Sequence, residues 1–191
     1  MEWTLLHVYF VPDPVEIAPV VDAYRDVLDE VDCVARQPDE WLHATVLMVD
    51  GIPTRDVTEQ QRADVEQQLR QVLGGLDAFT VTCGPALAGR SSIALDLVPD
   101  KDFMELVTLA KTAAGAVFGK AAVQYSGGRP HISLGYATGD GDSGIIQTTL
   151  RAATDLRATL TVDAVRLVDT HFDRDLVQFR WEDLAVIPLK R

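Results

Sequence analysis

The chain has 191 residues, of which 47% are hydrophobic and 24% charged, and its formal net charge is −12. This length and apolar content fit one domain over residues 1–191, and two closely packed lobes within it would also fit. The 29 acidic against 17 basic residues exclude a protein that holds long duplex nucleic acid through many phosphate contacts. An anionic partner must therefore be small, such as a nucleotide or an RNA end bound in a cleft.

Nothing in the chain predicts a membrane or an exported protein. No apolar run approaches the roughly 20 residues that cross a bilayer, and Glu2 stands where a signal peptide carries basic residues. Cys33 and Cys83 lack the spacing of a metal site. We therefore expect a cytoplasmic monomer that makes no membrane contact and keeps both cysteines reduced in its core.

The first part of the chain alternates strand and helix signals. Aromatic and β-branched residues fill the stretch from Trp3 to Val11, which predicts a strand, and Pro12-Asp13-Pro14 then predicts the start of a helix. A second strand is expected over Leu42 to Val49, closed by a turn at Asp50-Gly51. The order so far is strand, helix, strand.

The middle of the chain continues this order. Thr58-Glu59-Gln60-Gln61 has the capping-box pattern, and the helix that follows should end at Gly74-Gly75. Two strands over 78–83 and 92–98 should pair through a connection at Gly84-Pro85 and Gly89, followed by a helix that ends near Gly119.

The last part predicts a strand over 131–136, a helix around 145–153, and two long strands over 159–172 and 176–187. A strand carrying a histidine, a helix and an alternating strand occur in that order in each half, which is a weak internal repeat. The fold class predicted from this order is α+β with two related halves.

Two histidines lie in the same local pattern. Leu42-His43-Ala44-Thr45-Val46 and Pro130-His131-Ile132-Ser133-Leu134 both place an apolar residue, a hydroxyl residue and another apolar residue after the histidine. Because side chains alternate along a strand, His43 shares a face with Thr45, and His131 shares a face with Ser133. Each predicted strand thus presents an imidazole and a hydroxyl opposite its aliphatic side.

Paired motifs of this kind, about half a chain apart, resemble the signature of the 2H phosphoesterase superfamily, close to the bacterial 2′-5′ RNA ligase-like and 2′,3′-cyclic phosphodiesterase proteins. The resemblance implies a bilobal fold in which two antiparallel sheets line a central cleft, with helices on the outside. It also implies a hydrolase of RNA processing that needs no metal or other cofactor. Its reaction would open 2′,3′-cyclic phosphates of nucleotides or RNA ends.

The resemblance makes His43, Thr45, His131 and Ser133 the catalytic candidates. Opening a cyclic phosphodiester requires one proton taken from water and one given to the leaving ribose oxygen, and imidazole does both near pH 7. Hydroxyl groups can donate to the non-bridging phosphate oxygens. By analogy with the family, His43 is expected to act as the acid and His131 as the base.

The substrate-binding candidates are His7, Tyr9, Arg129 and Tyr136. His7 and Tyr9 alternate with apolar residues on the first predicted strand, so both should face away from the core. Arg129 precedes His131 by two residues and can hold a phosphate, whereas Tyr136 and Trp41 flank the motifs and can stack on a base. Surface or packing roles explain these residues as well.

Several alternatives stay open. Ligase-like members often carry a basic residue after the second motif, whereas this chain continues Leu134-Gly135-Tyr136-Ala137, which weighs against long or terminally phosphorylated RNA. The 2′-5′ RNA ligase reaction, or a non-catalytic nucleotide-binding sensor of the same fold, stays an alternative. A zinc site lacks the expected cluster of ligands in the sequence.

Overall fold

The computed structural model describes residues 4–125 and 128–191, so Trp3, where the first predicted strand begins, lies outside it. Within these residues the chain forms two antiparallel sheets and four α-helices. The strands are β1 (Thr4–Phe10), β2 (Val34–Arg36), β3 (Ala44–Pro53), β4 (Phe79–Ala88), β5 (Ser92–Val98), β6 (His131–Ala137), β7 (Ala158–Val162), β8 (Ala164–Asp173) and β9 (Gln178–Pro188). The α-helices are α1 (Pro14–Asp29), α2 (Glu59–Leu73), α3 (Asp100–Phe118) and α4 (Ser143–Ala153).

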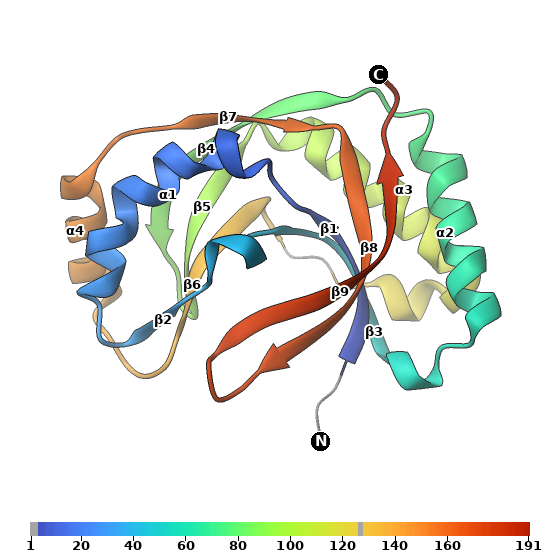
Figure 1. Ribbon diagram of the computed structural model, residues 1–191, viewed down its shortest axis with the longest axis horizontal. Helices are drawn as coiled ribbons and strands as arrows, with labels where there is room; N and C mark the ends of the chain where they lie inside the picture. Colours follow the sequence, from blue (N-terminus) through green and yellow to red (C-terminus); the bar gives the residue numbers. More distant parts are fainter. Residues whose placement is uncertain (1–3, 126–127) are drawn as a thin grey trace.

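The sheets have the strand orders β3-β1-β8-β9 and β2-β6-β5-β4-β7. Helices α2 and α3 pack on the first sheet, and α1 and α4 pack on the second. In Figure 1 the two helix pairs lie at opposite ends of the molecule, with the strands between them. The predicted α+β fold, with two antiparallel sheets and helices on the outside, is confirmed.

Local sequence explains where the helices begin. The Asp13 side chain accepts a hydrogen bond from the Val15 amide at the start of α1, which satisfies a backbone donor that no helical carbonyl can reach. The predicted capping box at the start of α2 is present, since Thr58 and Gln61 exchange side-chain and backbone hydrogen bonds. This helix ends at Leu73, with Gly74 as its C-cap.

The predicted turn at Asp50-Gly51 is wrong, because β3 continues to Pro53. Its pairing with β1 moves from His7 opposite Met48 to Leu5 opposite Pro53, so β3 advances five residues while β1 advances two. Gly51 has a φ of +75°, which glycine adopts at little cost. A β-bulge therefore absorbs the residues that the sequence pattern assigned to a turn.

The connection between strands that was predicted at Gly84-Pro85 is also a bulge within one strand. β4 runs on to Ala88, and its register with β5 shifts between Cys83 and Ala86. The two strands connect only after Ala88, around Gly89. Bulges keep the chain paired on either side of residues that interrupt the ladder, which is why glycine and proline mark no strand end here.

The long strand predicted over 159–172 is two strands in different sheets. β7 pairs with β4 in the second sheet, whereas β8 pairs with β1 in the first. Asp163 separates them, and its carbonyl accepts a hydrogen bond from the Leu189 amide. The alternating pattern runs through both strands because each has one buried face, so the sequence alone gives no sign of the crossing.

The short strand β2 was not predicted, since three residues carry no readable alternation. It pairs with β6 directly beside the second motif, with Arg36 opposite Gly135. A Cβ atom on Gly135 would lie 2.7 Å from the Ala35 carbonyl oxygen. The missing side chain at Gly135 is therefore what lets the two strands approach.

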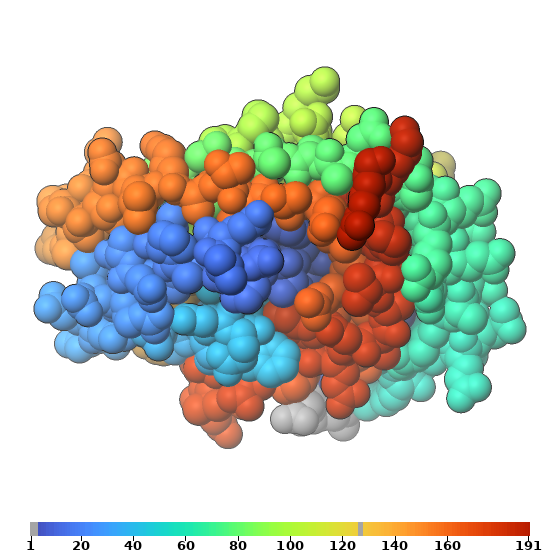
Figure 2. Space-filling view, turned by 45° about the horizontal axis from the view of Figure 1, so that its top comes forward, coloured from blue at the N-terminus to red at the C-terminus, as the bar shows by residue number. Residues whose placement is uncertain are grey.

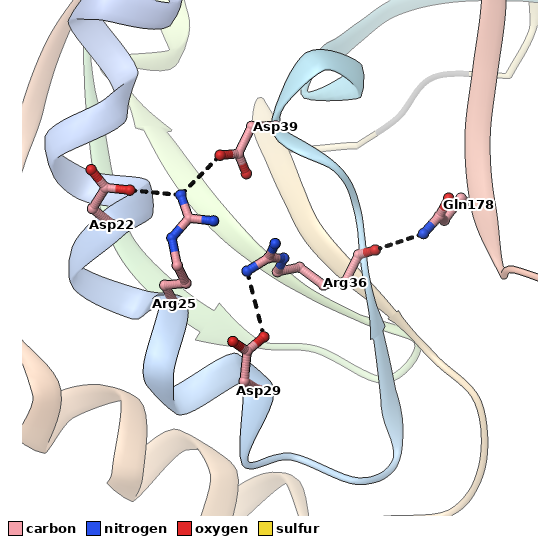
Figure 3. A network of polar contacts seen from close by, with 6 residues as sticks. All are labelled: Asp22, Arg25, Asp29, Arg36, Asp39 and Gln178. Atoms are coloured by element: carbon pink, nitrogen blue, oxygen red, sulfur yellow. Dashed lines mark hydrogen bonds and ion pairs between the residues drawn. The ribbon is translucent and has the colours of Figure 1, made fainter.

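Ion pairs and a hydrogen bond hold the segment from β2 to His43 against α1 and β9 (Figure 3). Arg25 of α1 lies 2.9 Å from the Asp39 carboxylate, and Arg36 lies 3.4 Å from Asp29. On the other side, the Gln178 amide donates to the Arg36 carbonyl at 3.1 Å. Solvent screens exposed pairs of this type, so they add little stability, and their main effect is to fix the position of the segment.

Candidate active site

The first motif lies at the start of β3, with His43 just before the strand and Thr45 in it, opposite Tyr9 of β1. Leu42, Ala44 and Val46 are buried in the main hydrophobic core. His43 and Thr45 point the other way and line a cavity of about 230 Å³. The two motif side chains thus share a face, as the alternation predicts.

The second motif opens β6 in the other sheet. Ile132 and Leu134 are fully buried in the same core, whereas His131 and Ser133 line the same cavity as His43 and Thr45. The fold therefore brings two segments far apart in sequence, one from each sheet, to a single cavity. Among the described residues its lining is His7, Tyr9, His43, Thr45, Met48, Ser91, Ser92, Tyr125, His131, Ser133, Tyr136 and Phe179.

Each cavity histidine is oriented by the carbonyl two residues before it. The Nδ1 atom of His43 lies 2.9 Å from the Trp41 oxygen, that of His131 lies 2.7 Å from the Arg129 oxygen, and that of His7 lies 3.1 Å from the Leu5 oxygen. A carbonyl only accepts hydrogen bonds, so Nδ1 carries the proton in each ring. When a ring is neutral, its Nε2 atom is then a free proton acceptor.

His43 sits in an aromatic box. Its ring stacks on Tyr9 with centroids 4.0 Å apart and meets the Trp181 ring edge-on at 5.1 Å. Only 6% of His43 is exposed. Burial removes water from the charged form and lowers the pKa of His43 to about 4, against the raising effect of the Trp41 hydrogen bond. The nearby His7 and His131 lower the pKa of His43 further.

His131 has a more open environment. Its ring is partly exposed and borders a second cavity of about 300 Å³, which contains Arg129 and Asp96 and shares Ser92 with the first. Solvent therefore reaches His131. The two motif histidines differ most in this respect.

The predicted binding residues separate into two groups. His7, Tyr9 and Tyr136 line the cavity with both motifs, and burial lowers the pKa of His7 to about 4 and raises the pKa of Tyr136 to about 12. Burial also raises the pKa of Tyr9. Arg129 instead lies in the adjoining cavity, where its Nε atom is 2.9 Å from the Asp96 carboxylate.

Trp41 does not line the two-histidine cavity in the described part of the chain. Its ring meets the Trp181 ring edge-on at 4.8 Å, and both rings border a larger cavity of about 460 Å³. Figure 2 shows the face where α1, the segment around Asp39–Trp41 and β9 come together, and these elements supply the lining of that cavity. Its lining among the described residues contains no histidine, so it lacks the paired imidazoles that make the smaller cavity the candidate site.

Five lining residues were not predicted, namely Met48, Ser91, Ser92, Tyr125 and Phe179. Met48 follows the first motif by a few residues, but alternation from His43 and Thr45 would have selected Leu47, which is buried in the core. A second register shift of β3 against β1, between Thr45 and Leu47, is what turns Met48 to the cavity. Ser91, Ser92 and Phe179 lie beside the motifs because β5 pairs with β6 and β9 pairs with β8. Tyr125 comes from the connection between α3 and β6. No local signal in the sequence identifies them.

The cavity lining contains histidine but no lysine or arginine among the described residues. The groups in this described lining that can carry positive charge are therefore the imidazoles, and Thr45, Ser133 and Ser92 supply hydroxyl groups. Across residues 4–125 and 128–191, no group of three or more His, Cys, Asp or Glu side chains is placed to hold a metal ion. The expectation of metal-free chemistry stays a prediction.

A family model described as the 2′-5′ RNA ligase superfamily matches residues 11–174, a stretch that contains both motifs. The chain belongs to the 2′-5′ RNA ligase superfamily. This confirms the 2H phosphoesterase resemblance and supports an enzyme of the phosphoesterase and ligase type. The sequence matches none of the curated proteins.

Solved structures share the fold at low sequence identity. The protein TT0787 of Thermus thermophilus superposes with a TM-score of 0.74 at 12% identity, covering 97% of this chain and 98% of that chain. A structure described as a phosphoesterase gives 0.72 at 15% identity, covering 98% and 99%. Escherichia coli LigT complexed with NADP+ gives 0.70 at 16% identity, covering 100% of both chains. At this level of sequence identity, the similarities show a shared fold alone.

None of the described helices is both long enough and apolar enough to cross a membrane.

Proposed function

We propose that this protein is a metal-independent phosphodiesterase that opens the 2′,3′-cyclic phosphate of a nucleotide or RNA end. The proposal rests on one observation above all. Two imidazoles from different sheets border one small cavity, and backbone carbonyls occupy the Nδ1 atom of both. Each ring therefore offers a single nitrogen, Nε2, for proton transfer, as paired acid–base catalysis requires.

The environments of the two rings support a division of roles. Burial keeps His43 neutral at pH 7, because its pKa is lowered to about 4. A neutral imidazole is a base, so we assign His43 as the general base and His131, the partly exposed ring, as the general acid. This reverses the assignment expected by analogy with the family, and burial is the physical reason.

The reaction then proceeds without a covalent intermediate. Nε2 of His43 takes a proton from a water molecule while the water oxygen attacks phosphorus. The bond between phosphorus and one ribose oxygen breaks, and His131 gives its proton to that oxygen. The product is a ribose phosphomonoester, and the two histidines have exchanged protonation states, so solvent must reset them before the next turnover.

The hydroxyl groups support the transition state. Thr45 and Ser133 line the cavity on either side, where each can donate to a non-bridging phosphate oxygen as charge develops there. A cyclic phosphodiester carries one negative charge, which one imidazolium neutralises. This balance suits a cavity whose described lining has no fixed cation.

The size of the cavity favours small substrates. A volume of about 230 Å³ holds a phosphate with part of a ribose, and the adjoining cavity beyond His131 offers about 300 Å³ more. LigT, which shares the fold, has been crystallised with 3′-AMP and with ATP. We therefore propose mononucleotides and short RNA ends as the substrate class.

The test is hydrolysis of the four nucleoside 2′,3′-cyclic phosphates and of a dinucleotide with a cyclic phosphate end, in EDTA. We expect turnover of the wild type without added metal and loss of activity in both His43→Ala and His131→Ala. Chromatography of the product identifies the broken ribose bond. Tight binding of these compounds without any turnover would contradict the proposal and favour a nucleotide sensor.

Ligation opens the same cyclic phosphate, but the 5′-hydroxyl of a second RNA end attacks phosphorus in place of water. It needs two RNA ends at the cavity, which the net charge of −12 opposes. Incubation of cyclic-phosphate RNA with a 5′-hydroxyl acceptor distinguishes the two activities. We expect hydrolysis to exceed joining at every RNA concentration tested.

A further inference from the structure

Gln37 is a buried amide at the junction of the two sheets. It lies in the two-residue connection after β2, and only 1% of it is exposed. Buried polar side chains are costly unless their hydrogen bonds are made. The partners of Gln37 therefore show what its side chain does.

The side-chain amide of Gln37 uses both its oxygen and its nitrogen. Nε2 donates to the Trp41 carbonyl at 2.9 Å and to the Phe179 carbonyl at 2.7 Å. Oε1 accepts from the Phe179 amide at 3.1 Å. The orientation of the amide is fixed by these partners, since two carbonyls require the nitrogen and one N–H requires the oxygen.

The Trp41 carbonyl is shared with the first motif. It accepts from Gln37 Nε2 at 2.9 Å and from His43 Nδ1, also at 2.9 Å. Gln37 and His43 are thus joined through one oxygen atom. The position of that oxygen determines the tilt and the tautomer of the His43 ring.

The backbone of Gln37 reaches the second motif. Its amide donates to the Leu134 carbonyl at 2.8 Å, next to Ser133 on β6. Phe179, the other partner of the side chain, lines the two-histidine cavity. Gln37 therefore makes hydrogen bonds to the backbone next to both motifs and to β9, the strand that carries Phe179.

We propose that Gln37 is a positioning residue, which holds the Trp41 carbonyl so that His43 presents Nε2 to the substrate. This rests on the proposed two-histidine reaction, in which His43 becomes an imidazolium during turnover. The Gln37 amide holds the Trp41 carbonyl in place, so the hydrogen bond from Nδ1 of His43 to that carbonyl is kept when the His43 ring becomes charged. Gln37 is not part of the described cavity lining, and its link to a motif histidine is the Trp41 carbonyl that it shares with His43.

The experiment replaces Gln37 with methionine, which keeps the length and apolar volume but donates no hydrogen bond. The matched control is Gln178→Met, because Gln178 makes a similar amide bond in the same seam, to the Arg36 carbonyl at 3.1 Å, and no hydrogen bond of it reaches Trp41 in the described residues. Both variants are compared with the wild type in kcat, KM and pH profile. Ring nitrogen NMR follows the tautomer and protonation of His43.

We expect Gln37→Met to lower kcat about 100-fold, the size that a displacement of about 1 Å produces, while KM changes little. The fraction of His43 protonated on Nδ1 should fall. The acid limb of the profile should move to lower pH, because the Trp41 hydrogen bond raises the pKa of His43 and is weakened in the variant. Gln178→Met should match the wild type in kcat, in the fraction of His43 protonated on Nδ1 and in the position of the acid limb. Equal losses in the two variants would show a purely structural role and overturn the proposal, as would unchanged activity in Gln37→Met.

Two further measurements separate the possible failures. If Gln37→Met does not fold, Gln37→Glu tests the same point, because a carboxylate can accept from the Phe179 amide but cannot donate to Trp41. In the wild type, a His43 ring protonated on Nε2 would overturn the proposal by itself. If the wild type hydrolyses no cyclic phosphate, the proposed function fails, while the NMR comparison of wild type and Gln37→Met still decides whether Gln37 orients His43.

Discussion

The two histidine motifs have nearly the same sequence pattern but different surroundings. His43 is enclosed by Tyr9 and Trp181 and is 6% exposed, whereas His131 borders an open second cavity. Each ring has its Nδ1 atom on the carbonyl two residues earlier. The comparison teaches that the motif supplies the same group twice, and that the two groups differ in burial, which is the basis of the roles proposed for them.

The strongest test of this difference removes each ring in turn. His43→Ala and His131→Ala should each lower kcat about 1000-fold, within the range of general acid–base catalysis. His43→Ala should abolish the acid limb of the pH–rate profile, and His131→Ala the alkaline limb. The opposite result, with the acid limb lost in His131→Ala, would restore the roles expected by analogy.

The hydroxyl of each motif should contribute less than its histidine. Ser133→Ala and Thr45→Val remove one donor each, and loss of one transition-state donor lowers kcat about 100-fold. The effect should be on kcat more than on KM, measured with a nucleoside 2′,3′-cyclic phosphate. A rise in KM of similar size, with kcat unchanged, would indicate that these hydroxyls bind the ground state.

Burial of histidine also makes the stability depend on pH. The pKa values of His7 and His43 are about 4 in the folded protein but about 6.5 when unfolded. Between those values the unfolded chain binds more protons, so stability is full above pH 6.5 and falls as the pH drops towards 4. Each histidine accounts for about 3 kcal/mol of this loss.

His7→Asn provides the measurement. Urea unfolding at pH 7 and at pH 4.5 should show a smaller loss of stability in the variant, by about 2 kcal/mol. His7 is preferable to His43 for this test because it belongs to neither motif. An unchanged difference between the two pH values would mean that His7 does not stay neutral in the fold.

The aromatic box can be opened without touching a motif. Trp181→Leu should admit water to His43, raise its pKa from about 4 and move the acid limb upward by about one pH unit. Trp41→Leu is the matched control, because the Trp41 ring contacts Trp181 but makes no ring contact with His43 among the described residues. The same shift in both variants would attribute the effect to general loosening.

The sequence by itself determined the class of fold, the two motifs and the face that each presents. These follow from period-two alternation and from capping patterns, which act over a few residues and are therefore visible locally. It also indicated His7, Tyr9 and Tyr136 as cavity candidates, and the structure places all three with the motifs.

Only the tertiary structure decided the rest. Phe179, Tyr125 and Ser92 reach the cavity through strand pairing and packing between distant segments, and Arg129 is drawn to Asp96 because β5 lies beside β6. The bulges at Gly51 and Gly84 and the crossing at Asp163 depend on which strand lies next to each segment. The unequal burial of His43 and His131 has the same origin, since desolvation depends on every neighbour in space and not on the residues next to it in the chain.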